Sequence, residues 1–315
     1  MSEVTDRLIW LDGELVPWER ATVHVLSHSI QRGSLVFDYM SVRETARGPA
    51  VFRLDDHLER FATSTDLVGL PVELGPAELR PAVLETVRAN PGCRNLKISA
   101  FLPSIEVDVV PQDPRISIAI AAYETRADVI DKNPGKFHFA PEIKLWIEKE
   151  RRNRRADIMP PQAKVASNYT SPMVAKWRAR KNGYDEIVLV DEHDKLAEAP
   201  TSNIFLVDAE GALHTPSLAN VLPGITRRTV IELARHDGRA VHEESIDPDA
   251  LFSAAEVFLT TTTAGVWPVV SVDGKTVGEG AIGPVSQALL DRLHQVERGE
   301  DPEFANWLAY AGERS

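Results

Sequence analysis

A single lysine, Lys164, stands alone in the stretch "MPPQAKVASNYTSP", which begins at Met159. The nearest other lysines are Lys149 and Lys176. Most lysines are solvated surface residues, and Lys164 can be read in that way. An isolated amine between a rigid Pro-Pro pair and small residues can also be held for covalent chemistry, in which it attacks a carbonyl group. Lys164 is therefore the first candidate catalytic residue.

The stretch "LPGITR" is suited to binding an anion. Leu222 and Gly224 lead into a predicted helix, whose first residues offer free backbone N–H groups. Thr226, which follows Ile225, adds a hydroxyl and is expected to cap the helix. Ordinary helix starts have the same features, so this stretch alone does not decide for a ligand.

A second anion-binding stretch, "TTTTAGVW", follows the apolar run "EVFL". The hydroxyls of Thr261, Thr262 and Thr263 and the amide of Ala264 could bind an oxyanion where a strand ends. The preference of threonine for strands explains the same residues without a ligand.

Further polar groups complete a chemical set. Glu198 lies in an apolar setting, where a carboxylate is buried only beside a cation. His57 and Arg60 are three residues apart on one predicted helix face, and Tyr169 follows Lys164 closely. Pyridoxal phosphate needs a lysine for a Schiff base, a carboxylate for its ring nitrogen, a donor for its phenolate and several donors for its phosphate. The set therefore predicts this cofactor.

The elements that must position these residues form two predicted α+β domains. Residues 1–122 and 137–315 mix strands and helices, and the polar segment 123–136 with its Asn-Pro-Gly is the predicted linker. A helix is expected in "RLDDHLERFATSTDLVGL", stopping at Gly69. A hairpin is expected around the Asp-Gly of "LIWLDGELVPW".

Composition excludes several classes of function. The 315 residues carry a net charge of −12, which argues against nucleic-acid and anionic-membrane partners. Cys93 is the only cysteine, so a disulfide framework is excluded and a reducing, cytoplasmic location is expected. The sequence predicts no signal peptide, membrane span or metal site. A basic run, "KERRNRR", reads as a solvated face, although one of its arginines could line a pocket.

The motifs together resemble a known family. "HSIQRGSLVFD", "FRLDDHLERF", "AKVASNY", "AEAPTSNIF", "LPGITR" and "EVFLTTTTAG" occur in the order typical of the fold-type IV pyridoxal-phosphate enzymes, the class IV aminotransferases. The chain is most similar to the branched-chain aminotransferase group. This resemblance implies an α+β (α/β) fold with the cofactor at the interface of two domains. It also implies a homodimer whose active sites take residues from both subunits.

The resemblance also implies residue roles. Lys164 would bind the cofactor covalently and move the proton, Tyr169 would contact the phenolate oxygen, and Glu198 would pair with the ring nitrogen. The remaining cofactor-binding residues implied are Arg60, Leu222, Gly224, Ile225, Thr226, Thr261 and Thr262.

The substrate side departs from the branched-chain pattern. The usual tyrosine and arginine that shape the carboxylate side are absent, and Arg32, Lys97 and Arg126 are the predicted substitutes. The other predicted substrate-binding residues are Phe37, Tyr39, Thr263, Ala264 and Trp267. "FDYMSV" is more similar to the (R)-selective amine transaminases.

The predicted activity is transfer of an amino group from an amino acid or amine to a 2-oxo acid, with branched-chain-like or other hydrophobic substrates. A D-amino acid or (R)-amine transaminase on the same scaffold is the main alternative. An aminodeoxychorismate lyase and a non-catalytic cofactor carrier are the others.

Overall fold

The computed structural model describes residues 6–132 and 140–312, and the chain divides into two compact units. One unit takes the first part of the chain, up to residue 132, together with Ala163–Ser167 and the part from Val296 onward. The other takes residue 140 to Gln162 and Asn168–Gln295. The predicted linker, 123–136, lies near this division, but its residues 133–136 fall outside the described residues. As a domain boundary it stays a prediction.

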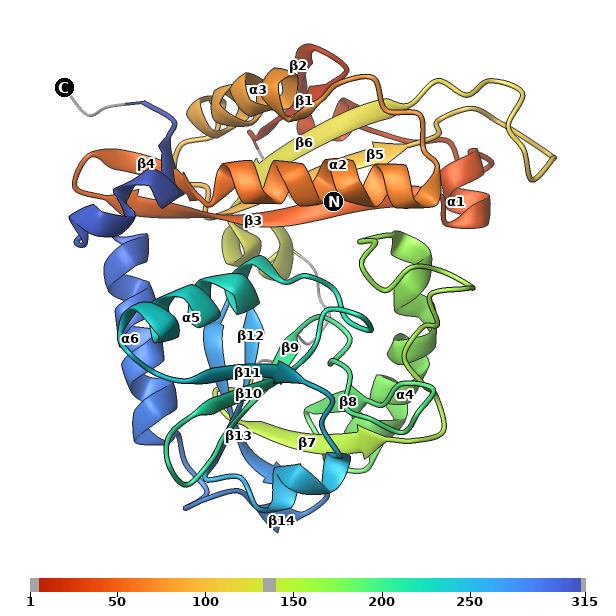
Figure 1. Cartoon of the computed structure of the whole chain (residues 1–315). Coiled ribbons are helices and arrows are strands. Elements are labelled where there is room, and N and C mark those ends of the chain that lie inside the picture. Colours follow the sequence, from red (N-terminus) through yellow and green to blue (C-terminus); the bar gives the residue numbers. More distant parts are fainter. Residues whose placement is uncertain (1–5, 133–139, 313–315) are drawn as a thin grey trace. The chain divides into compact units, whose positions relative to one another are not determined.

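The first unit is built on one sheet, and its two longest helices, α2 and α3, pack on that sheet. Its strand order is β15-β4-β3-β5-β6-β1-β2, with every printed pair antiparallel. Helices α2 and α3 pack on the same face of this sheet, where α2 contacts β3 (Figure 1). The strands are β1 (Leu8–Leu11), β2 (Glu14–Pro17), β3 (Leu35–Thr45), β4 (Gly48–Phe52), β5 (Asn95–Phe101), β6 (Ser117–Tyr123) and β15 (Leu308–Tyr310).

Local signals set the boundaries of the helices in this unit. Helix α2 (Leu54–Val68) ends at Gly69, which adopts a left-handed conformation with φ of 71°. Helix α3 (Pro76–Ala89) begins with Pro76, as prolines favour the first helical turn. Helix α1 (His28–Arg32) is short, and Thr125–Ile130 forms a single π-helical stretch. The predicted hairpin is confirmed, since Asp12 and Gly13 both have positive φ between β1 and β2.

The second unit holds another sheet, with strand order β11-β10-β9-β12-β13-β7-β8 and β14 paired to β13. Apolar clusters cover both of its faces: Phe205 and Phe258 stack on the side of α5, and Leu145, Ile204 and Leu259 fill the other side. The strands are β7 (Ile143–Glu148), β8 (Glu186–Leu189), β9 (Asn203–Val207), β10 (Leu213–Pro216), β11 (Val241–Glu244), β12 (Glu256–Thr261), β13 (Gly265–Val272) and β14 (Lys275–Thr276).

The remaining helices include α4 (Thr170–Lys181), α5 (Ile225–His236) and α6 (Pro284–Glu297). Short 3-10 turns occur at Trp18–Arg20, Ala166–Tyr169, Pro248–Phe252 and Pro302–Trp307. Among the described residues, no helix has both the length and the apolar character needed to cross a membrane.

Candidate active site

The segment that carries Lys164 is paired with the first sheet. Val165 and Val36 form an antiparallel bridge, and the N–H of Phe37 donates to the Lys164 carbonyl at 3.1 Å. The Lys164 N–H donates to the Ser64 hydroxyl of α2 at 3.1 Å. The backbone of the lysine is thus fixed by β3 and α2, so Lys164 is not part of a loose surface loop.

The side chain of Lys164 lies over an aromatic ring. Its Nζ is 4.9 Å from the centroid of the Phe37 ring, and Nζ of Lys97 is 4.5 Å from the same centroid. Burial, and then the charge of Lys164, lowers the pKa of Lys97 below its ordinary value. The amines of Lys164 and Lys97 therefore lie on the same face of the first sheet. Of the two, only Lys164 was predicted to react covalently.

Tyr39 lies on the same face as Phe37, because alternate residues of β3 share a face. Its hydroxyl donates to Oδ1 of Asn95 at 2.6 Å, and the Asn95 amide donates to the Thr125 hydroxyl at 2.7 Å. Burial raises the pKa of Tyr39 well above its ordinary value, which keeps the hydroxyl protonated. Tyr39 is thus a fixed neutral donor.

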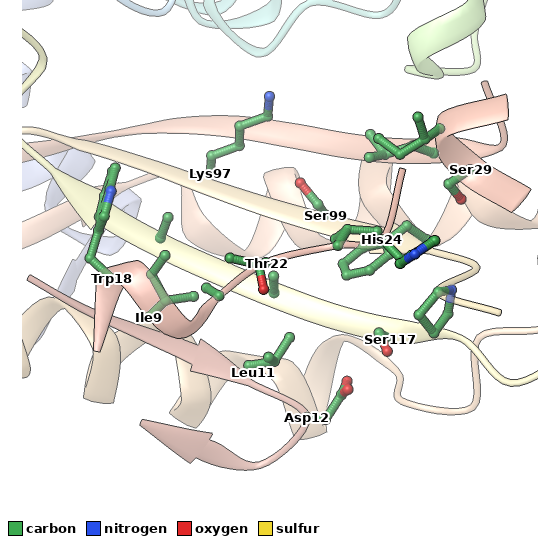
Figure 2. A pocket seen from close by; sticks show the side chains of 18 of the residues that line it. Ile9, Leu11, Asp12, Trp18, Thr22, His24, Ser29, Lys97, Ser99 and Ser117 are labelled. Atoms are coloured by element: carbon green, nitrogen blue, oxygen red, sulfur yellow. The ribbon is translucent and has the colours of Figure 1, made fainter. Parts of the chain in front are cut away.

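An apolar cavity of about 610 Å³ opens beside these residues on the first unit. Figure 2 shows Lys97 projecting from β5 at one edge of this cavity, with Ile9 and Leu11 of β1 across from it. Leu35 and Phe101 also line it. The face that carries Lys97 therefore has room for an apolar group.

The opposite face of β3 carries a buried ionic group. Nε and Nη2 of Arg60 donate to the two Asp38 carboxylate oxygens at 2.8 and 2.7 Å. His57 Nδ1 lies 2.7 Å from Asp38 Oδ1. Arg60 is 8% exposed and Asp38 is fully buried. The family resemblance implies that Arg60 binds the cofactor, and the structure adds its carboxylate partner, Asp38.

Glu198 is buried on the second unit and is well paired. Arg154 donates to its Oε1 at 2.9 Å, and the Leu222 N–H donates to its Oε2 at 3.0 Å. Asn203 Nδ2 contacts the same Oε2 at 3.3 Å. This confirms the expectation that a buried carboxylate there needs a cation. Arg154 belongs to the basic run "KERRNRR", of which one arginine was expected to be able to line a pocket. No feature of the sequence indicated Asn203.

The start of α5 differs from the prediction in its cap. Gly224, not Thr226, is the N-cap residue, and Thr226 is already inside the helix. A Cβ on Gly224 would lie 2.0 Å from Oδ1 of Asn203, so only glycine fits. Asn203 Nδ2 donates to the Leu222 carbonyl at 3.0 Å, which holds the loop. The prediction that Thr226 caps the helix was wrong because the close approach of Asn203 fixes the cap at the earlier glycine.

The threonine stretch turns between β12 and β13. The Thr261 hydroxyl accepts a hydrogen bond from the Ala264 N–H at 2.9 Å and lies 3.3 Å from the Thr263 hydroxyl. Thr262 and Ala264 are half-buried and Thr263 is exposed. Trp267 donates its indole N–H to the Ala140 carbonyl at 2.8 Å and packs partly against the core.

The remaining predicted residues lie in different places. Tyr169 is half-buried and precedes α4 as its N-cap. Arg32 is exposed at the end of α1 and donates to the Val107 carbonyl at 2.9 Å. Arg126 is largely exposed, and its Nε lies 3.9 Å from Oδ2 of Asp131. On the first unit, the structure thus groups Lys164, Phe37, Tyr39 and Lys97, but it does not bring Arg32 or Arg126 into contact with them.

Comparison with known proteins identifies the family. Residues 35–272 match the family described as amino-transferase class IV. The chain belongs to this family. Like other class IV aminotransferases, it is a pyridoxal-phosphate-dependent transaminase with the fold-type IV architecture.

A relative of this class IV aminotransferase matches over nearly its whole length. The branched-chain-amino-acid aminotransferase of Escherichia coli strain K12 is 34% identical over 304 residues. The match covers 95% of this chain and 96% of the relative. The similarity therefore extends over both units and is not confined to one motif.

Solved structures of branched-chain aminotransferases have the same fold as this chain. An Escherichia coli branched-chain amino acid aminotransferase has a TM-score of 0.89 and 30% identity, covering 98% of this class IV aminotransferase and 100% of its own chain. The branched-chain amino acid aminotransferase from Thermobaculum terrenum, solved in its PLP-form, has a TM-score of 0.86 and 29% identity, covering 98% and 99%.

The residues present fit the cofactor. Lys164 supplies an amine of fixed backbone position, and Glu198 is a buried carboxylate held by Arg154. The start of α5 and the turn after β12 supply backbone N–H groups and hydroxyls. No group of three or more His, Cys, Asp or Glu side chains in residues 6–132 and 140–312 is arranged to hold a metal ion.

Proposed function

We propose that this chain transfers the amino group of branched-chain-like, hydrophobic L-amino acids to a 2-oxo acid. The observation that carries the proposal is the fixed amine of Lys164 over the Phe37 ring, on an apolar face of the first sheet. The relatives are branched-chain aminotransferases, which supports transamination over the lyase reaction.

We assign the cofactor-binding residues from the resemblance to the family. Lys164 is the proposed catalytic residue, and Glu198 the partner of the ring nitrogen. Pyridoxal phosphate, when bound, supplies an electron sink for the pair of electrons left on the substrate carbon after proton loss. The further proposed cofactor-binding residues are Arg60, Tyr169, Leu222, Gly224, Ile225, Thr226, Thr261 and Thr262.

Within this scheme Lys164 would accept the proton from the substrate α-carbon and pass the same proton to the cofactor carbon, so that one carbon loses the proton that the other gains. Because its backbone is pinned to β3 and α2, only its side chain has to move. Glu198, oriented by Arg154, favours a positive charge on the ring nitrogen.

The substrate side is proposed to use Phe37, Tyr39 and Lys97. Lys97 is a cation on the same face as Lys164, and a carboxylate bound there would lie among apolar groups. Tyr39, whose hydroxyl is held by its hydrogen bond to Asn95, contributes its ring to the same face. Arg32, Arg126, Thr263, Ala264 and Trp267 stay predictions.

We also propose a homodimer. The segments around residues 25–30 and 105–110 contact each other: Ser27 and Ile105 form an antiparallel bridge, and His28 Nε2 lies 2.8 Å from the Val109 carbonyl oxygen. Their apolar side chains are exposed, with Val107 at 96% and Val109 at 74%. A surface of this kind is suited to a second copy of the chain. We call it the valine patch: Val25, Leu26, Ile30, Ile105, Val107, Val109 and Val110.

The test is a half-reaction on purified protein loaded with pyridoxal phosphate. L-Leucine, D-alanine, D-glutamate and (R)-1-phenylethylamine are added separately without an acceptor, and the visible absorbance of the cofactor is followed. Rapid loss of the band with L-leucine alone is expected. Loss with only the D-acids or the (R)-amine would contradict the substrate proposal.

The control is Lys164→Ala. This variant should bind cofactor without the lysine-dependent band and lose roughly a thousand-fold or more of its transamination rate. Lys195→Ala, which removes a lysine paired with the exposed carboxylate of Asp247, should leave both unchanged. A Lys164→Ala protein with normal rate would overturn the assignment.

A further inference from the structure

Asp38 lies at the centre of a buried cluster of three polar side chains, Asp38, His57 and Arg60. Asp38 itself has no part in the proposed proton transfer. It faces α2, on the side of β3 opposite to Phe37 and Tyr39. It accepts two hydrogen bonds from Arg60, one from His57 and one from the Tyr39 backbone N–H, the last at 2.7 Å. Burial alone would raise the pKa of the Asp38 carboxyl, but Arg60 and His57 hold it well below its ordinary value. Asp38 is therefore ionised.

His57 supports this carboxylate as a neutral ring. Burial lowers the pKa of His57 despite the attraction of Asp38. Since an ionised carboxylate only accepts, Nδ1–H of His57 is the donor to Asp38. The ring is 2% exposed and shares Oδ1 of Asp38 with Nη2 of Arg60.

The two bonds to Asp38 fix the plane of the Arg60 guanidinium. They use Nε and Nη2, so the planar group can no longer rotate about its last side-chain bonds. Two parallel bonds of this kind set geometry as well as energy.

The same two elements also hold Lys164. Asp38 directly follows Phe37, whose N–H donates to the Lys164 carbonyl. Ser64, which accepts from the Lys164 N–H, lies one helical turn after Arg60 on α2. One strand, β3, and one helix, α2, thus hold both the Arg60 guanidinium and the backbone of Lys164.

We propose that Asp38 is a positioning residue for phosphate recognition: it orients Arg60, relative to Lys164, for the phosphate of the cofactor. This inference rests on the proposed function, in which Arg60 binds that phosphate. An Arg60 without Asp38 keeps its charge but loses its fixed plane. Phosphate binding then weakens, while reaction of Lys164 with the aldehyde is unaffected.

The test compares two ligands that share the aldehyde. Pyridoxal phosphate and pyridoxal, which lacks the phosphate, are titrated into apo-protein, and the visible band reports binding to Lys164. In Asp38→Asn the Kd for pyridoxal phosphate should rise roughly 10-fold or more, while that for pyridoxal changes less than about twofold. Equal changes for both ligands, or none, would overturn the proposal.

Three further variants sharpen the result. Asp55→Asn removes a carboxylate paired with Arg80 on the exposed side of α2 and should change neither Kd. In an Arg60→Ala background, Asp38→Asn should add no further selective loss. Where Asp38→Asn does not fold, Asp38→Glu keeps the charge, displaces the carboxylate, and should give the same selective loss.

Wild-type protein separates the two proposals. If folded wild-type protein gives no band with pyridoxal phosphate, the proposed function fails. If wild-type protein binds normally and the Asp38 variants show no phosphate-selective loss, only the positioning role fails.

Discussion

Single side chains on the second unit are held by a few strong partners, and Arg154 is the clearest case. Its Nη2 contacts both the Pro161 carbonyl and Oε1 of Glu198, and both charged side chains are largely buried. Removing one partner of a buried pair leaves an uncompensated charge. Breaking the pair is therefore expected to destabilise the protein even before any cofactor binds.

Arg154→Ala should lower the free energy of unfolding of apo-protein by roughly 3 kcal/mol, because Glu198 loses its cation. Urea unfolding checks this value. The neighbouring Arg155 is exposed and pairs with Asp157, so Arg155→Ala should cost less than about 1 kcal/mol. Similar losses in the two variants would show that Arg154 makes no special contribution.

The residue types at the site were predictable because each has a narrow chemical use. Lys164 and Glu198 were predicted from their isolation and setting, and the cation beside Glu198 was expected. Asp38 and Asn203 were missed, since each acts through a partner distant in sequence. Asp38 bonds a residue 22 positions away, and Asn203 bonds one 19 positions away.

At the scale of the element, steric contact with Asn203 restricts which residue can precede α5. Gly224 has an extended backbone, with φ of −63°, so alanine is conformationally allowed there. Its Cβ would nevertheless collide with Asn203. The cost of a side chain is therefore one of space and not of backbone strain.

Gly224→Ala should lower the free energy of unfolding by about 1 to 3 kcal/mol and weaken cofactor binding, because Asn203 must move away from the Leu222 loop. Gly75→Ala is the matched control. Gly75 is also an extended N-cap residue, but its Cβ would meet only the flexible end of Glu78 at 3.1 Å. Thermal unfolding and cofactor titration of both variants provide the comparison, and equal effects would contradict the argument.

The edge strand β11 is held by a histidine of β10. His214 Nδ1 lies 2.6 Å from Glu244, and its Nε2 lies 3.0 Å from Asp208. Burial would lower the pKa of His214, but these two carboxylates raise it above 6.5. A protonated ring can donate to both at once.

Because the folded pKa of His214 is raised, its contribution to stability is fully present below pH 6.5 and is lost as the pH rises through the folded value. The stability difference between wild type and His214→Gln should thus be about 1 kcal/mol at pH 5.5 and smaller at pH 9. Chemical unfolding at several pH values measures it. His193, an exposed ring 3.8 Å from Glu192, is the control, and a pH-independent difference for His214 would sink the idea.

The elements themselves were largely predictable, since their ends have local causes such as Gly69 and the Asp12–Gly13 turn. Which elements pair with one another was not predictable. Pairing of the Lys164 segment with β3 joins residues more than a hundred positions apart, and no local pattern encodes which strand edge it meets.

At the scale of the whole molecule, the charge of −12 and the valine patch act in opposite directions. Net charge of one sign disfavours association, whereas apolar exposure favours it. Self-association through the valine patch would therefore be strengthened by added salt, which screens the charge.

Val107→Asp together with Val109→Asp should convert a dimer of this chain into a monomer, because two carboxylates would be placed in the contact. Sedimentation velocity measures the mass. Ile158→Asp changes an exposed apolar residue (74%) outside the patch and should leave the dimer intact. A wild-type monomer at all salt concentrations would rule out the proposed homodimer.

The return of β15 to β4 has a consequence for synthesis on the ribosome. Leu308, Ala309 and Tyr310 pair with Phe52, Val51 and Ala50, so the first unit is built from both ends of the chain. Its sheet cannot be completed while translation is still in progress through the second unit, which is contiguous apart from Ala163–Ser167. The second unit can therefore mature first, and the nascent first unit keeps an open edge at β4 until residues 308–310 have left the exit tunnel.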